Sequence, residues 1–180
     1  RTATAAFLRS RGAESDIRAS LTLPSTFIMS LTHKLDDRWE ILGDVSRTGW
    51  SSISKVDIMR TSGAKAQTLD TDFRDAWRLA VGGNYQYNDA WKLKFGVAYD
   101  QTPVKRAETR LASLPDNDRV WLSLGAQWAP SKSSRLDLGA TYIHVRDSKI
   151  NNNQTTAATG DSLSRGTVTG EYSGNIWLFG

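Results

Sequence analysis

Apolar and polar residues alternate one by one along much of this 180-residue chain. In residues 91–99 the odd positions are Trp, Leu, Phe, Val and Tyr, whereas the even positions are Lys, Lys, Gly and Ala. Successive side chains of a β-strand point to opposite faces, so this pattern predicts a strand with one apolar and one polar face. The same alternation recurs in residues 27–35, 77–87 and 119–128.

Three less regular segments bring the number of predicted strands to about seven. Residues 39–54, 135–149 and 166–180 are rich in β-forming residues and glycine. No apolar run approaches the ~18 residues that a transmembrane helix requires, which excludes a helical membrane protein. We therefore predict an all-β chain in which no helix is needed.

Short and long connections alternate strictly between the predicted strands. The short ones carry turn-forming residues and are residues 36–38, 88–90 and 129–134. The long ones are polar and lie at about residues 55–71, 101–116 and 150–165. Bacterial outer-membrane barrels have short periplasmic turns and long extracellular loops. The pattern therefore favours a transmembrane antiparallel β-barrel over a soluble all-β sandwich, which remains the alternative.

Aromatic residues gather where such a barrel would meet the lipid headgroups. Four of them lie within one or two residues of a short turn: Trp39, Tyr87, Trp91 and Trp128. Barrels carry aromatic girdles at this level, although a soluble sandwich could use the same side chains as core anchors. The polar faces would line the lumen with Lys92, Lys94, Arg78, Asn84, Gln86, Arg119 and Asp137.

Composition narrows the function classes. Lys and Arg number 23 against 19 Asp and Glu, and this scattered net charge of +4 gives no nucleic-acid patch. The chain has no Cys and two His, so we expect no disulfide framework, no thiolate nucleophile and no Cys- or His-rich metal site. It also lacks P-loop and G-x-S-x-G patterns. We predict no enzyme activity, no catalytic residues, no metal and no cofactor.

Asp116 and Asp118 are the one acidic pair that invites a chemical interpretation. They could act as acid and base, or bind calcium together with Asn117. An Asp-Asn-Asp run is more often turn chemistry, because these side chains hydrogen-bond to nearby backbone groups. We favour the turn.

Six segments share their order and spacing with one family. They are residues 21–24 (LTLP), 42–46 (LGDVS), 73–78 (FRDAWR), 100–104 (DQTPV), 114–121 (LPDNDRVW) and 177–180 (WLFG). From about residue 20 onward, the chain resembles the C-terminal half of the FadL-type long-chain fatty acid transporters of the Gram-negative outer membrane.

The resemblance implies a monomeric 14-stranded barrel, plugged by an N-terminal hatch. Residues 1–180 would be the C-terminal portion of this one domain, with the hatch and the first strands absent. Hydrophobic compounds would be captured at the extracellular mouth, diffuse through the barrel and leave sideways into the bilayer. The implied partners are a long-chain fatty acid or a similar hydrophobic molecule, outer-membrane lipid and lipopolysaccharide, without nucleic acid. Aromatic hydrocarbon uptake, a structural or adhesion barrel and a water-filled porin remain alternatives.

Four residues are candidates for ligand contact: Arg119, Trp121, Arg78 and Leu69. A fatty acid needs an apolar groove and a cation for its carboxylate, and the first three fall on the predicted lumen face. Arg119 could instead pair with Asp116 or Asp118 and fix the loop, and Arg78 could belong to a lumen charge ladder. Leu69 lies near the point where some relatives have a lysine, and the nearest upstream Lys is Lys65.

The ends of the chain indicate a fragment. It opens at Arg1 without a charged-then-apolar leader and stops at Gly180, several residues before the end expected from the family pattern. A seven-stranded piece has two edges, and each unsatisfied backbone group in lipid costs several kcal/mol. We predict that the isolated 180-residue chain does not fold in detergent. A cooperative unfolding transition, followed by circular dichroism, would contradict this.

Overall fold

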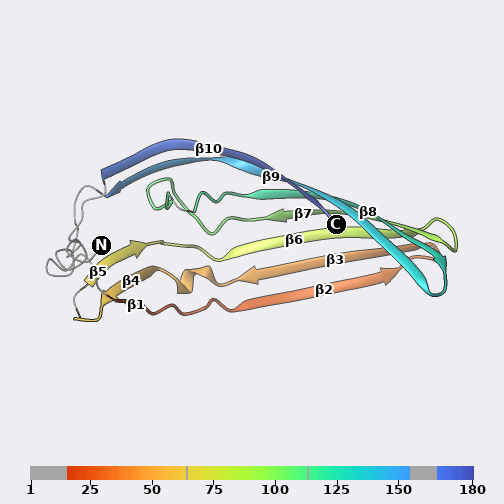
Figure 1. Cartoon of the computed structure of the whole chain (residues 1–180), viewed down its shortest axis with the longest axis horizontal. Helices are drawn as coiled ribbons and strands as arrows, with labels where there is room; N and C mark the ends of the chain where they lie inside the picture. Colours follow the sequence, from red (N-terminus) through yellow and green to blue (C-terminus); the bar gives the residue numbers. More distant parts are fainter. Residues whose placement is uncertain (1–15, 64, 113, 155–165) are drawn as a thin grey trace, which may run out of the picture.

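The computed structural model describes residues 16–63, 65–112, 114–154 and 166–180, which form two antiparallel sheets (Figure 1). The larger sheet has seven strands in the order β10-β9-β8-β7-β6-β3-β2, and the smaller has three in the order β1-β4-β5. The larger sheet consists of β2 (Thr26–Lys34), β3 (Trp39–Thr48), β6 (Ala76–Gln86), β7 (Trp91–Asp100), β8 (Arg119–Ser131), β9 (Ser134–Gln154) and β10 (Gly166–Phe179). The smaller consists of β1 (Ile17–Ala19), β4 (Lys55–Arg60) and β5 (Lys65–Asp70).

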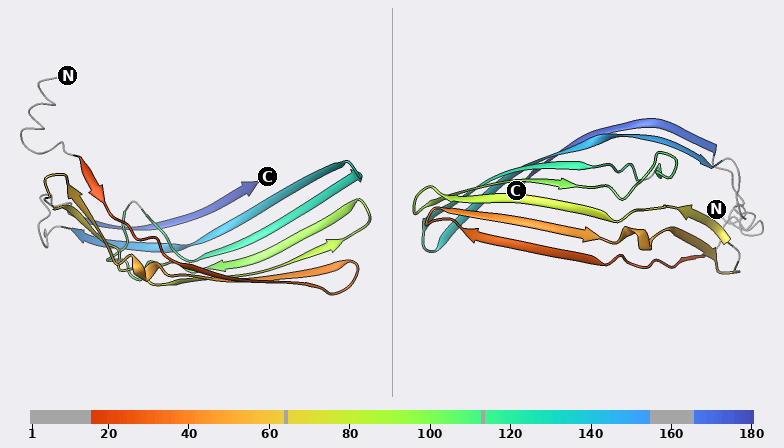
Figure 2. Two further views of the ribbon diagram at one scale, coloured as in Figure 1. Left: turned by 90° about the horizontal axis from the view of Figure 1, so that it is seen from below. Right: turned by 180° about the vertical axis from the view of Figure 1, so that it is seen from behind.

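The prediction of an all-β chain with about seven main strands is confirmed. The helical content of the described ranges is one 3-10 turn, η1 (Trp50–Ser52), which follows β3. None of the described residues belongs to a helix long and apolar enough to cross a membrane. Figure 2 shows that the larger sheet is curved, and β2 and β10 lie at its two edges. The chain thus supplies an arc of strands.

Strand register separates the two faces of this arc as the alternation predicts. Arg78, Asp100 and Arg119 lie side by side on β6, β7 and β8, on the face that we call the inner face. Positions one residue away from these belong to the outer face, which is largely apolar and exposed; Leu79 and Leu122 are 54% and 51% exposed. Inner-face side chains on the same strands are half-buried, because side chains on a concave surface converge. An uncovered apolar face of this extent is what a lipid-facing wall presents.

Two of the short connections are closed by the same hydrogen-bonding device. The Asp36 carboxylate accepts hydrogen bonds from the backbone N–H groups of Arg38 and Trp39, both at 2.7 Å. The Asn88 side-chain oxygen accepts bonds from the N–H groups of Ala90 and Trp91, both at 2.9 Å. In each case a short polar side chain binds the backbone N–H groups that lead into the next strand. At Asn88 it acts beside a backbone turn bond, from the Trp91 N–H to the Asn88 carbonyl at 3.3 Å.

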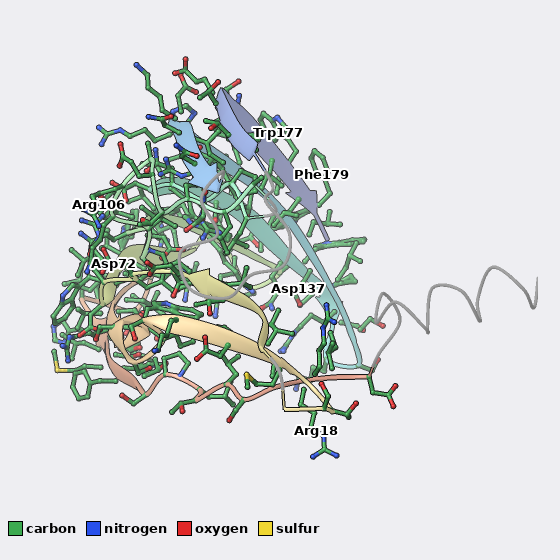
Figure 3. The ribbon with its side chains drawn as sticks, turned by 90° about the vertical axis from the view of Figure 1, so that its left-hand side faces the viewer. Arg18, Asp72, Arg106, Asp137, Trp177 and Phe179 are labelled. Carbon is green, nitrogen blue, oxygen red and sulfur yellow. The ribbon has the colours of Figure 1, made fainter. Side chains whose placement is uncertain are left out.

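The aromatic residues beside the short turns lie on the outer face and contact one another. The ring centroids of Trp39 and Tyr85 are 4.7 Å apart, and those of Trp91 and Trp128 are 5.9 Å apart in a stacked arrangement. Such pairs contribute beyond the area that they bury. A second cluster lies on β9 and β10, where Trp177 is 4.7 Å from Tyr142 and 6.2 Å from Phe179 (Figure 3).

Two of the connections predicted as long loops are partly strands, which corrects the sequence interpretation. Residues 55–71 form the β4–β5 hairpin, in which Val56 and Ile58 supply β-branched residues and Gly63, at φ 83°, supplies the turn. In the 150–165 connection, β9 continues to Gln154 in register with β10, and residues 155–165 lie outside the described ranges. Composition alone missed these extensions because ladder hydrogen bonds do not require apolar side chains.

Glycines meet at the centre of the inner face. Gly82 of β6 and Gly96 of β7 are direct partners in the ladder. A Cβ atom on Gly82 would lie 2.9 Å from the carbonyl oxygen of Phe95, a backbone atom that cannot rotate away. Gly43 of β3 has nothing within 4 Å of the corresponding position.

We therefore predict that Gly82→Ala destabilises the full-length protein that carries this chain by about 1–3 kcal/mol, through forced backbone displacement. Gly43→Ala is the matched control and should leave stability unchanged to within about 0.5 kcal/mol. Urea unfolding in detergent micelles measures both changes. Equal stabilities for the two variants would contradict the close approach at Gly82.

Candidate functional site

The inner face brings Arg78 and Trp121 together across an intervening strand. The Arg78 guanidinium lies over the Trp121 indole, 5.6 Å from its centroid. Arg78 is on β6 and Trp121 is on β8, so β7 separates them and their backbones are about 10 Å apart. Ala98 of β7 is the ladder partner of Trp121 and is buried, and its small side chain leaves room for the contact.

These two residues border a hollow of about 410 Å³ on the inner face. Arg78 and Trp121 line it near the long connections, and Ser30 and Asp44 line it toward β2. Small residues dominate the strands between them: Ala80, Gly82, Gly96 and Ala98. The hollow therefore combines an apolar floor with a cation stacked on an aromatic ring, a combination suited to an amphipathic organic anion.

Arg119 pairs with Asp116, as one of the sequence interpretations proposed, and it also lies near Asp100, which was not predicted. Its guanidinium lies 2.9 Å from the Asp116 carboxylate and 3.9 Å from that of Asp100. Arg119 thus fastens the end of the 101–118 connection to β7. The Nε of Arg119 and the Nε1 of Trp121 are buried, and neither donates a hydrogen bond to any residue within the described ranges. Buried N–H donors without an acceptor are uncommon in folded proteins, so this corner of the inner face has hydrogen-bonding capacity that the described residues do not use.

Asp118 serves a different set of donors. Its carboxylate accepts hydrogen bonds from the Tyr99 hydroxyl at 2.7 Å and from the Thr102 backbone N–H at 2.9 Å. The Asn117 side chain donates to the carbonyl of Asp147 at 2.7 Å and accepts a bond from the N–H of Asp118. The Asp-Asn-Asp run therefore cross-links segments that are distant in the sequence, instead of closing a local turn as predicted. None of the described His, Asp or Glu residues form a group of three that could hold a metal ion.

Arg110 anchors the middle of the same connection to β9. Its side chain donates to the carbonyl of Asp116 at 3.2 Å and to the carbonyl of Lys149, and the residue is only 6% exposed. Burial lowers the pKa of the Arg110 guanidinium, and the nearby Asp116 carboxylate partly offsets this effect. This role could not be predicted from the sequence, because a lone arginine in a polar loop belongs to no periodic pattern.

Two ion pairs join the 101–118 connection to the segment that follows β5. The Asp72 carboxylate accepts hydrogen bonds from Lys105 Nζ at 2.8 Å and from an Arg106 guanidinium nitrogen at 3.0 Å (Figure 3). The hydrogen bond from Lys105 is the largest cause of a lowered pKa of the Asp72 carboxyl, and Arg106 lowers this pKa further. Asp72 has φ of 40°, in the left-handed region that Asp tolerates better than most residues. The 101–118 connection is thus fastened at several separate points.

Leu69 is not brought together with the other three candidates. It lies on β5 in the smaller sheet, where it pairs with Val56 of β4. Val56 packs with Trp50 against a buried apolar cluster of Ile53, Phe73 and Val104. This cluster, which sequence analysis missed, forms a small core beneath the long connections.

Comparison with known proteins places the whole chain in one group. Residues 1–180 match the family described as "Outer membrane protein transport protein (OMPP1/FadL/TodX)". The chain is 34% identical to the long-chain fatty acid transport protein of Escherichia coli strain K12 over 169 residues, which cover 94% of the chain and 35% of that protein. The chain thus spans about a third of the length of the curated relatives that it matches.

Solved structures agree with this relationship. A Pseudomonas aeruginosa FadL homologue has a TM-score of 0.78 and 30% identity, covering 91% of this chain and 36% of that one. The Pseudomonas putida toluene transporter TodX has a TM-score of 0.52 at 21% identity, covering 77% of this chain and 32% of that one, and shares the fold. The curved sheet is therefore part of a transmembrane β-barrel, and the prediction of an outer-membrane location is confirmed.

The geometry of Arg119 leads to a prediction about stability. The Arg119–Asp116 pair is 34% and 17% exposed, so we expect a coupling free energy of about 1 kcal/mol in a double-mutant cycle of Arg119→Gln and Asp116→Asn. Lys94 and Asp137 form a control pair that is 42% and 51% exposed and should couple more weakly. Urea unfolding of the full-length protein in micelles gives both values. A coupling at Arg119 no larger than the control would show that the pair does not fasten the loop.

Proposed function

The chain belongs to the outer membrane protein transport protein family (OMPP1/FadL/TodX), and on this premise we propose that the full-length protein carries long-chain fatty acids passively across the outer membrane. The family consists of transport proteins rather than enzymes, and hydrophobic compounds are the cargo that its named members share. The observation that carries the finer proposal is the stacked Arg78–Trp121 pair at the border of the inner-face hollow.

A fatty acid needs two kinds of contact, and this corner of the inner face offers both. The acyl chain requires an apolar surface, which Trp121 and Ala98 provide. The carboxylate requires a cation, which Arg78 provides. The Arg78 guanidinium has five N–H donors, more than its contact with the Trp121 ring can occupy, so donors remain for a carboxylate. Asp100 is the ladder partner of Arg78 and would compete with the ligand, so the expected affinity is moderate, in keeping with a molecule that must leave again.

Arg119 takes a supporting part in this proposal. Its ion pair with Asp116 holds the 101–118 connection near the hollow. We place it among the residues that shape the mouth, and we assign the carboxylate contact to Arg78. Leu69 belongs to the smaller sheet, and we propose that it contacts ligand at the extracellular entrance.

Aromatic hydrocarbon uptake is the second candidate, because the toluene transporter TodX shares the fold. The two cargoes differ in one chemical respect: toluene has no carboxylate. A site that uses Arg78 therefore favours an acid, whereas Trp121 can contact either molecule through its ring. We propose a monomer that captures its cargo at the extracellular mouth and lets it diffuse through a barrel plugged by a segment outside this chain.

Uptake of labelled oleate and labelled toluene by cells that produce variants of the full-length protein tests the proposal. Arg78→Gln should lower oleate uptake about tenfold and leave toluene uptake unchanged, because the variant loses only the charge-assisted hydrogen bonds. Trp121→Ala should lower the uptake of whichever cargo is carried. Lys92→Gln, an inner-face cation near a short turn, is the matched control and should change neither.

Each other outcome has a definite meaning. Toluene uptake without oleate uptake would assign the aromatic hydrocarbon function. Oleate uptake equal in cells with and without the gene, together with no ligand binding to the purified protein, would favour a structural or adhesion barrel. Passage of small hydrophilic solutes in a liposome swelling assay would indicate a water-filled porin. Unchanged oleate uptake in Arg78→Gln would remove Arg78 from the site.

A further inference from the structure

The outer face has a hollow of about 680 Å³ on the wall that faces the membrane. It is centred on β3 and its neighbours, and Met29, Leu31, Leu79 and Val81 border it with exposed apolar side chains. Gly43 lies among them, and nothing stands within 4 Å of the place that its Cβ would occupy. The volume falls within the ~300–1,000 Å³ typical of sites for small ligands. The missing side chain at Gly43 thus leaves a gap in an otherwise continuous apolar surface.

A fixed cation stands farther along the same strand. Arg47 is four residues from Gly43, which is about 13 Å toward the long connections. Its guanidinium is ion-paired with Asp75 and lies 6.0 Å from the centroid of the Trp77 ring. Asp75 is in turn fixed by the backbone N–H of Ser51, at 3.1 Å. The Arg47 side chain is 50% exposed, so it is held in place while part of its donor edge faces outward.

We propose that the Gly43 hollow and Arg47 together bind lipopolysaccharide of the outer leaflet, one acyl chain in the hollow and one phosphate at Arg47. The long connections are extracellular in barrels of this class, so Arg47 lies toward the outer headgroup level and the hollow lies deeper. An arginine binds phosphate through paired N–H donors, and an aromatic ring beside it suits the same interface. Arg47 at the headgroup level and the hollow deeper in the wall therefore match the positions of the phosphate and the acyl chain of an anionic lipid.

The proposal is independent of the cargo. It depends on the outer face and on the orientation of the barrel, whereas the transport proposal depends on Arg78 and the inner face. Asp75 neutralises part of the charge of Arg47, so the phosphate contact is weakened, and van der Waals packing of the acyl chain in the hollow supplies the rest of the binding.

The test uses the full-length protein, purified from outer membranes in a mild detergent, and measures the lipopolysaccharide that remains bound. Gly43→Leu fills the hollow and Arg47→Gln removes the cation, and each should lower retained lipopolysaccharide about five- to tenfold. Ala126→Leu adds three carbons elsewhere on the outer face, against four for Gly43→Leu, and Arg135→Gln removes a cation beside the β8–β9 turn. Both controls should retain the wild-type amount of lipopolysaccharide. Gly43→Ala is a smaller filling variant in case Gly43→Leu does not fold.

Several results would overturn the proposal. Retention that is equal in the site variants and the controls would show that neither Gly43 nor Arg47 contacts lipopolysaccharide. Displacement of the bound lipid by an excess of phosphatidylglycerol would show a general anionic-lipid surface instead. Oleate uptake by Arg47→Gln cells should stay at the wild-type level, so a loss of retained lipid with normal uptake would support the lipid site separately from the transport function.

Discussion

Backbone hydrogen bonding in lipid is the constraint on which the rest of this structure depends. Inside a bilayer no water is present to satisfy an N–H or carbonyl group, so a strand must pair on both sides. The ladder from β10 to β2 meets this demand for the five interior strands, and the pairing fixes the register of each. Register in turn decides which side chains face the lumen, because a shift of one residue would exchange the two faces. The meeting of Arg78, Ala98 and Trp121 is a product of that register.

The polar contacts are concentrated where the lipid ends. Arg110 donates to loop and strand carbonyls, Asp118 accepts from a loop N–H, and Asp116 accepts from the Thr102 hydroxyl. Asp72 binds two cations of the same connection. The apolar cluster of Ile53, Phe73 and Val104 lies beneath these loops. The long connections thus have their own small core and their own hydrogen-bond network, which explains how polar segments keep a defined shape at the mouth of a barrel.

The faces of the strands could be predicted from the sequence because a period of two is a local property. Trp91 to Tyr99 shows it in nine residues, and the register confirms it. The contact between Arg78 and Trp121 could not be predicted, since it requires two strand registers and the small size of Ala98 at once. The place of Leu69 relative to the other candidates could not be predicted for a similar reason: the resemblance indicated its position along the chain, but the β4–β5 hairpin puts it in a different sheet. The Arg119–Asp116 pair was foreseen as an alternative because the two residues are three apart.

The side-chain closure at Asp36 and Asn88 has a consequence for how such a wall is assembled. Each of these corners is held together by atoms from four consecutive residues, so its shape can form before any distant strand arrives. The hydrogen bonds between the two strands of each hairpin can then form progressively away from the turn, because the strand register is already set at the turn. Closure of these two turns therefore sets the alignment of β2 with β3 and of β6 with β7 by local contacts, separately from the pairing of β3 with β6.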